Sequence, residues 1–335
     1  MVGGMPVIQL ESIVAARKRI ERYVYRTPFV QSATLTKLCG APIGLKLEHH
    51  QRTGSFKLRG ATNAVLSLTP EERARGVVTA STGNHGRALA YAAKLQGSNA
   101  TVCMSHLVPD NKVAEIRSLG ANVRIVGKSQ DDAQEEANRL AADNGLVLVL
   151  PFDHPNVVAG QGTLGLEIVD AMPDVMTVLV PLSGGGLAAG VAAAVKGRSP
   201  KARVIGLTMD RGAAMKASLD VGRPVQVEEV ASLADSLGGG IGLDNAVTFE
   251  MCRALLDDVI LLSEAEIAAG MRHAYSQERE VIEGAGAVGI AALLSGRLGR
   301  LDGPVAVILS GRNVDMDLHR RVINGAIDPF KEEEV

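Results

Sequence analysis

The sequence has 335 residues, contains no tryptophan and is only 3% aromatic. Stacking platforms for nucleobases are therefore scarce. Its 35 basic and 37 acidic residues balance to a formal charge of −2, and no long basic run occurs, so we expect no nucleic-acid partner. Apolar runs such as VMTVLVPL stop well short of the ~20 residues that a membrane helix needs, so we expect no membrane partner either.

Cysteine is also scarce. The three cysteines, Cys39, Cys103 and Cys252, are scattered and form no CxxC pair, which predicts reduced thiols in a cytoplasmic protein. The N-terminal segment lacks the basic start, apolar core and small-residue cleavage site of a signal peptide, which favours the same location.

Several catalytic motifs are missing. There are seven histidines but no HxxxH, HExxH or Cys/His cluster, so no metal is predicted. His49 and His50 are adjacent, and on a strand they would point to opposite faces, which is poor ligand geometry. The absence of GxSxG disfavours an α/β-hydrolase.

Glycine, in contrast, is abundant, with 37 residues that recur just after short β-branched runs. Helical patterns follow two of these turns, at Gly86–Leu95 and Leu187–Lys196. Strands that alternate with helices predict an α/β fold with parallel sheets covered on both faces. One compact series runs from about Gly76 to Phe152, and a larger one ends near Ile308. Ligands of such sheets bind at the carboxyl ends of the strands, where the glycine-rich turns lie.

The first candidate site is the segment TGSFKLRGA, residues 53–61. Lys57 in it could be an ordinary surface lysine. A lysine that forms a Schiff base must instead be desolvated, so that its amine is neutral and nucleophilic. The apolar neighbours Phe56 and Leu58 are compatible with that environment.

The second candidate is STGNHG, residues 81–86, directly before a predicted helix. Backbone amides at a helix N-terminus bind anions, and a carboxylate is the natural guest. The alternative is a capped helix start with Thr82 or Asn84 as the cap, which accounts for one of the polar residues but not for all four.

Two more segments follow predicted strands. Ser183–Leu187 (SGGGL) can wrap its backbone around a phosphate, although it matches neither a P-loop nor GxGxxG. The alternative is a flexible turn. Ser310, which opens SGRN after the strand Val305–Leu309, offers a hydroxyl that could meet a heterocycle nitrogen.

In this order, the four segments resemble those of fold type II pyridoxal-phosphate enzymes, above all threonine/serine dehydratases and serine racemase. The resemblance runs from about Ile13 to Ile323. It implies a tryptophan-synthase-β-like homodimer with the cofactor, pyridoxal 5′-phosphate, in the cleft between two parallel-sheet domains. The large cofactor-binding domain would comprise residues 1–75 and 153–335, and the small substrate-closing domain residues 76–152.

The same resemblance implies roles for single residues. Lys57 would be the Schiff-base lysine, Phe56 would pack on the cofactor ring, Asn84 would donate to its phenolic oxygen, and Ser310 would bond the pyridine nitrogen. The 5′-phosphate would be held by Ser183, Gly184, Gly185, Gly186 and Leu187. The substrate would be held by Ser81, Thr82, Gly83, His85 and Asn156.

The implied reaction is elimination of water and then ammonia from a β-hydroxy-α-amino acid, which yields a 2-oxo acid, with Lys57 as the base. Thr82 stands where serine racemase has its second base, so a racemase is an alternative. Glu48-His49-His50-Gln51-Arg52 resembles the hydroxyectoine-utilisation dehydratases, and 3-hydroxyaspartate is another candidate substrate. A non-catalytic binding protein would lack the lysine or the glycines, which are both present.

Overall fold

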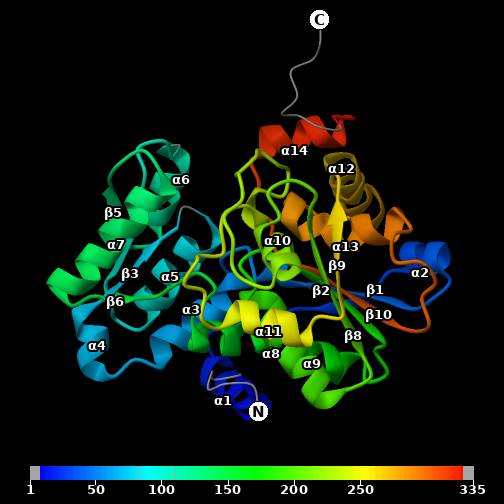
Figure 1. Ribbon diagram of the computed structural model, residues 1–335, viewed down its shortest axis with the longest axis horizontal. Helices are drawn as coiled ribbons and strands as arrows, with labels where there is room; N and C mark the ends of the chain where they lie inside the picture. Colours follow the sequence, from blue (N-terminus) through cyan, green and yellow to red (C-terminus); the bar gives the residue numbers. More distant parts are fainter. Residues whose placement is uncertain (1–7, 82, 109, 327–335) are drawn as a thin grey trace, which may run out of the picture.

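Among the residues that the structure describes, ten strands form two separate sheets, on the left and the right of Figure 1. The computed structural model describes residues 8–81, 83–108 and 110–326. The smaller sheet has the order β5-β4-β3-β6 and is parallel throughout. The larger has the order β1-β2-β10-β7-β8-β9. It is parallel except for the edge strand β1, which runs antiparallel to β2. The predicted α/β class with two parallel-type sheets is confirmed.

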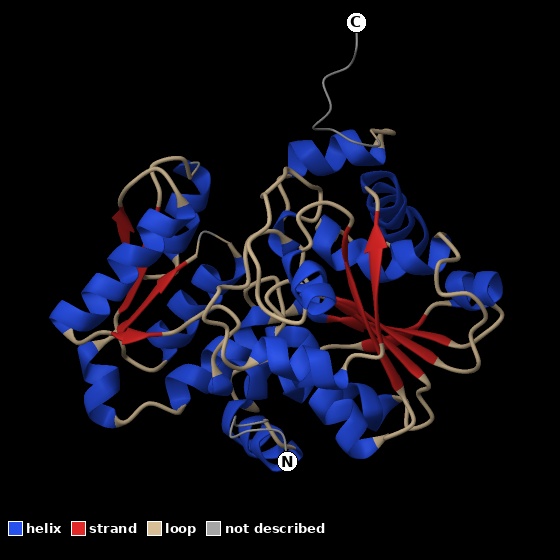
Figure 2. Ribbon diagram, in the orientation of Figure 1, coloured by secondary structure: helices blue, strands red, loops and turns tan. Residues whose placement is uncertain are grey.

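The smaller sheet lies among helices of its own part of the chain (Figure 2). Its elements are α4 (Pro70–Arg75), β3 (Val77–Ala80), α5 (Asn84–Leu95), β4 (Ala100–Met104), α6 (Asp110–Ser118), β5 (Asn122–Ile125), α7 (Gln130–Asn144) and β6 (Val147–Leu148). The domain limits at residues 76 and 152 stay a prediction. All four strands of the smaller sheet lie between these limits.

The larger sheet draws on both ends of the chain, because β1 and β2 come from the N-terminal part and β10 from the C-terminal part. Its strands are β1 (Phe29–Gln31), β2 (Ile43–Leu47), β7 (Thr177–Pro181), β8 (Arg203–Met209), β9 (Asp258–Leu262) and β10 (Val305–Leu309). Its helices and turns are α1 (Leu10–Ile20), α2 (Ala33–Cys39), η1 (Glu48–His50), α3 (Lys57–Leu66), α8 (Pro155–Ala171), α9 (Gly186–Arg198), α10 (Ala214–Val221), η2 (Asp235–Leu237), α11 (Thr248–Leu255), α12 (Glu264–His273), η3 (Ala274–Glu278), α13 (Gly284–Leu294) and α14 (Met316–Ile323).

The central strands β2, β7 and β10 are buried along their whole length. Such continuous apolar runs are typical of parallel sheets with helices on both faces. Helices α8 and α9 cross closely at Gly162 and Gly190. A Cβ at Gly162 would lie 2.9 Å from the Gly190 carbonyl oxygen, and one at Gly190 would lie 2.7 Å from the Gly162 nitrogen. Glycine is therefore required on both helices. In the part of the chain that is described, no helix is long and apolar enough to cross a bilayer.

The inference that His49 and His50 have poor ligand geometry, which held for a strand, is wrong because they do not lie in one. Strand β2 ends at Leu47, and both histidines lie in the 3₁₀ turn η1. A 3₁₀ turn has three residues per turn, so successive side chains are about 120° apart rather than opposed. Both rings consequently reach the same carboxylate, that of Glu280.

Candidate active site

A cavity of about 720 Å³ opens between loops that follow strands of both sheets. This volume is typical of a site for a small ligand or cofactor. The predicted site residues that line it are Phe56, Lys57, Ser81, Gly83, Asn84, His85, Ser183, Gly184, Gly185, Gly186, Leu187 and Ser310. Thr82 lies outside the described residues.

Lys57 stands at the start of α3, where its Nζ donates to the Pro151 carbonyl oxygen at 2.8 Å. Burial lowers the pKa of Lys57 to about 8, although the carboxylate of Glu283 opposes the shift. The Phe56 ring lies beside it, with 5.4 Å between the ring centre and Nζ. A desolvated amine of this pKa is neutral often enough near pH 8 to act as a nucleophile or base.

The glycine-rich loop joins β7 to α9, which begins at Gly186. Gly185 has φ 87°, and a Cβ there would lie 2.8 Å from Met215 Cε and 2.9 Å from Cys252 Sγ. A Cβ at Gly186 would lie 3.0 Å from the Phe152 backbone. These contacts exclude larger side chains, and Gly185, Gly186 and Leu187 line the cavity. The first N–H groups of a helix have no partner within the helix, so those of α9 are available to a ligand there. This is suitable geometry for a phosphate.

The start of α5 forms the opposite wall. Ser81 follows β3, and its Oγ accepts the Gly86 N–H at 3.3 Å. His85 Nε2 is 3.0 Å from the Val149 carbonyl oxygen, while the buried Nδ1 has no hydrogen-bond partner among the described residues. Burial and the charge of Lys57 lower the pKa of His85 to about 3. His85 is therefore neutral and can offer a ligand a hydrogen bond but no charge.

Asn84 belongs to a polar network that sequence reasoning missed. Its Nδ2 donates to Glu283 Oε1 at 2.9 Å, and its Oδ1 accepts from Asn313 Nδ2 at 2.5 Å. The backbone N–H of Asn313 donates to the other Glu283 oxygen at 3.1 Å. Burial, with a contribution from Asp235, raises the pKa of Glu283 to about 7. A carboxyl group close to Lys57 can therefore exist in both protonation states near neutrality.

A local signal for Glu283 was present in the sequence. It directly precedes the uncharged helix α13 and sits at its N-cap position. A carboxylate is favourable there because it faces the positive end of the helix dipole.

Ser310 directly follows β10 and is only 2% exposed. Its carbonyl oxygen accepts the Phe56 N–H at 3.0 Å, and Ser55 pairs with Gly311 in an isolated bridge. These contacts fix the lysine segment to the end of β10. Asn156 is not among the residues that line the cavity, because it lies in the first turn of α8, where its carbonyl oxygen accepts from Asn63.

These groups fit pyridoxal phosphate. Lys57 supplies an amine of lowered pKa, the α9 loop supplies bare amides for a phosphate, and Ser310 supplies a hydroxyl at the end of the central strand. The buried Nδ1 of His85, which has no hydrogen-bond partner among the described residues, is a further polar atom with which a ligand would form a hydrogen bond.

Comparison with known proteins points the same way. A protein of Sinorhizobium fredii, which its name assigns provisionally to threonine dehydratase, is 68% identical over 97% of this chain and 98% of its own length. The L-threonine ammonia-lyase of Thermotoga maritima is 42% identical over 95% of this chain and 79% of its own. The structure of maize serine racemase superposes with a TM-score of 0.89 at 31% identity, over 95% of this chain and 98% of that one. The family model for pyridoxal-phosphate dependent enzymes matches residues 20–311. The chain therefore belongs to the family of pyridoxal-phosphate dependent enzymes.

Proposed function

We propose that the protein is a pyridoxal-phosphate-dependent lyase that eliminates water and ammonia from threonine or serine. One observation carries the proposal: the Lys57 amine, the α9 glycine loop and the start of α5 line a single cavity. The elimination activity in the names of the Thermotoga and Sinorhizobium relatives supports the same reaction class.

The bound cofactor supplies an electron sink for the electrons of the Cα–H bond. The residues of this chain supply the rest. The amides of the α9 loop would hold the phosphate, and the Ser310 hydroxyl would hold the ring nitrogen. Lys57 Nζ, with its lowered pKa, takes the Cα proton as general base.

At the other wall, the amides of α5 together with Ser81 and Gly83 would hold the substrate carboxylate. The neutral His85 ring donates its Nε2–H to the Val149 carbonyl oxygen, so its Nδ1 would accept a hydrogen bond from a donor group of the ligand. Contacts from Thr82 and Asn156 stay predictions. Groups from both walls line this one cavity, and a substrate that displaced water from it would strengthen each of these interactions.

Replacement of the lysine tests the proposal. Lys57→Ala should abolish formation of 2-oxobutanoate and ammonia from L-threonine, while the circular dichroism spectrum stays that of the wild type. The exposed Lys94 at the end of α5 offers a matched control, and Lys94→Ala should keep full activity. Borohydride reduction of the holoenzyme, followed by peptide mapping, should find the cofactor on Lys57. Cofactor on another lysine would refute the assignment.

A racemase is the second candidate, since the superposition on maize serine racemase covers nearly the whole chain. D-serine and pyruvate formed together from L-serine separate the two functions. An excess of pyruvate supports elimination, and an excess of D-serine supports racemisation. Thr82→Ser should raise D-serine formation if the residue at this position acts as the second base.

We further propose that the enzyme is a cytoplasmic homodimer. Sedimentation at several concentrations checks the dimer. A substrate panel that includes 3-hydroxyaspartate and intermediates of hydroxyectoine breakdown checks the choice of threonine and serine. An enzyme inactive on both but active on a larger hydroxylated amino acid would keep the reaction and change the substrate.

A further inference from the structure

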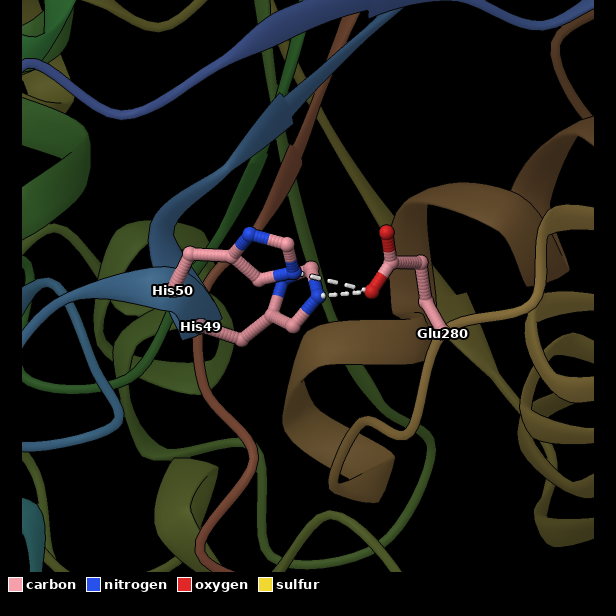
Figure 3. Close-up of side chains that lie close together, drawn as sticks. All are labelled: His49, His50 and Glu280. Atoms are coloured by element: carbon pink, nitrogen blue, oxygen red, sulfur yellow. Dashed lines mark hydrogen bonds and ion pairs between the residues drawn. The ribbon is translucent and has the colours of Figure 1, made fainter.

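Two histidines and a glutamate from distant parts of the chain meet outside the catalytic cavity (Figure 3). His49 Nε2 lies 2.8 Å and His50 Nε2 2.9 Å from the same oxygen of Glu280. All the potential ligand atoms lie within 4.8 Å of one another. None of the three residues lines the cavity that holds Lys57. The cluster is thus a separate convergence of good metal ligands.

The backbone that delivers Glu280 is unusual. Residues Ala274–Glu278 form a π-helical turn, and Arg279 has φ 63°, the only positive φ of a non-glycine residue in the described part of the chain. The N–H of Glu280 then closes back on the Ala274 carbonyl oxygen at 3.0 Å. Both π-turns and left-handed non-glycine residues cost stability and gather at functional sites. Here they turn Glu280 back toward the two histidines.

The ligand types suit a metal. Neutral imidazoles and one carboxylate are the ligand set of many zinc sites that keep a fourth position open. Mg²⁺ and Ca²⁺ prefer oxygen ligands throughout.

The spacing also suits a metal. Around tetrahedral zinc, with bonds of about 2.0–2.2 Å, neighbouring ligand atoms lie about 3.3 Å apart. The two nitrogen–oxygen distances of 2.8 and 2.9 Å need to open by only a few tenths of an ångström. His50, whose side chain is 38% exposed, provides a path for entry.

We propose that His49, His50 and Glu280 bind one transition-metal ion of the zinc class, with water at the fourth position. The ion would join the η1 turn, which leads into the Lys57 segment, to the loop that leads into Glu283. None of the three metal-binding residues lines the cavity, so the ion would stabilise the two segments beside the cavity rather than take part in the reaction. The proposal does not depend on which reaction the enzyme catalyses.

Calorimetric titration of the tag-free holoenzyme with Zn²⁺, and with Co²⁺ as a spectroscopic probe, tests this site. We expect one ion per chain and visible Co²⁺ bands of a low-symmetry site. His50→Ala and Glu280→Gln should each weaken binding by at least the roughly 10–100-fold that even outer-shell partners of a metal contribute. Zinc should also raise the melting temperature of the wild type but not of these variants.

The exposed His106, which lies outside the cluster and whose Nδ1 is 2.8 Å from the Gly127 carbonyl oxygen, offers a control. His106→Ala should leave the affinity for zinc unchanged. Circular dichroism and cofactor content show whether each variant is folded, and His50→Asn serves if His50→Ala is not. Failure of the wild type to bind zinc, or equal affinity in the wild type, His50 and Glu280 variants, would overturn the proposal.

Discussion

Lys57 and Arg59 lie two residues apart in the first turn of α3, yet their surroundings differ completely. Arg59 is fully buried and contacts two carboxylates, those of Glu48 at 2.8 Å and Glu167 at 2.7 Å. Lys57 has no carboxylate within ion-pair distance among the described residues, and its Nζ donates to a backbone carbonyl oxygen. Two cations on one helical turn therefore have opposite electrostatic environments.

The consequence appears in their pKa values. Burial disfavours the charge of both, but the two carboxylates more than compensate and raise the pKa of Arg59, whereas burial dominates for Lys57 and lowers its pKa to about 8. Lys46 completes the buried ion cluster (Lys46, Glu48, Arg59 and Glu167) with a bond of 2.6 Å to Glu167. A cation with full counter-charge is chemically inert and holds the scaffold. The cation without it is available for chemistry.

Removal of the paired cation should have the largest effect on stability. Arg59→Met leaves Glu48 and Glu167 buried without their main partner, and we expect it to lower the free energy of unfolding by about 3–5 kcal/mol. Denaturant unfolding measures the loss. The exposed pair of Arg17 and Asp170, 2.9 Å apart, is the control, and Arg17→Met should cost less than about 1 kcal/mol. Equal losses would mean that the buried ion cluster contributes no more to the free energy of unfolding than an exposed ion pair does.

Removal of Lys57, the cation without a carboxylate partner, should raise the free energy of unfolding rather than lower it. The pKa of Lys57 is about 8 in the folded protein and 10.5 as the ordinary value, so folding opposes its charge at every pH below 8. Lys57→Met should therefore stabilise the cofactor-free protein by up to about 3 kcal/mol at pH 7. The gain should shrink as the pH rises from 8 to 10.5, where the wild-type lysine loses its proton in the unfolded chain too. A destabilised variant at pH 7 would contradict the comparison.

Substitution of Glu283 should change the free energy of unfolding by a smaller amount, and it should do so in a lower pH range. Its pKa is about 7 when folded against an ordinary 4.5, so the wild type should lose stability as the pH rises from about 4.5 to 7. Glu283→Gln should flatten that part of the profile by about 1–2 kcal/mol, because the relief of buried charge is partly offset by poorer acceptance from Asn84 and Asn313. Unfolding at pH 5 and pH 8 measures the difference. An unchanged slope would show that Glu283 is already ionised at pH 5.

The same substitution tests how Glu283 affects the pKa of Lys57. Glu283 raises the pKa of Lys57 against the effect of burial, so Glu283→Gln should shift the pH dependence of cofactor capture by the apoprotein to lower pH. Capture is followed by absorbance after addition of pyridoxal phosphate. Asn313→Asp, which alters the network without removal of the carboxylate, is the matched control and should not produce that downward shift.

Local pattern was enough for much of the fold. The alternation of β-branched runs, glycine turns and helical periods predicted α5 and α9 within two residues and β10 with its bounds, and it predicted the glycine loop before α9. It missed β1 as an antiparallel edge strand, since three residues carry little pattern. The geometry of the two histidines was misjudged because it was considered for a strand, whereas β2 ends at Leu47 and the turn η1 carries both of them. Asn84 and Glu283 bond across 199 residues of chain, a separation that no local spacing reveals.

The short bridge between Ser55 and Gly311, together with the bond from the Phe56 N–H to the Ser310 carbonyl oxygen, affects how quickly and how tightly a cofactor can be taken up. These two contacts join the backbone next to Lys57 to the backbone of Ser310, and the side chains of both residues are the groups expected at either end of the ring. Immobilising a backbone residue costs about 1–2 kcal/mol in entropy, and here folding has already met that cost. The cofactor can therefore bind with little rearrangement of this backbone. Less of the binding free energy is spent on ordering the chain, so the cofactor should dissociate more slowly.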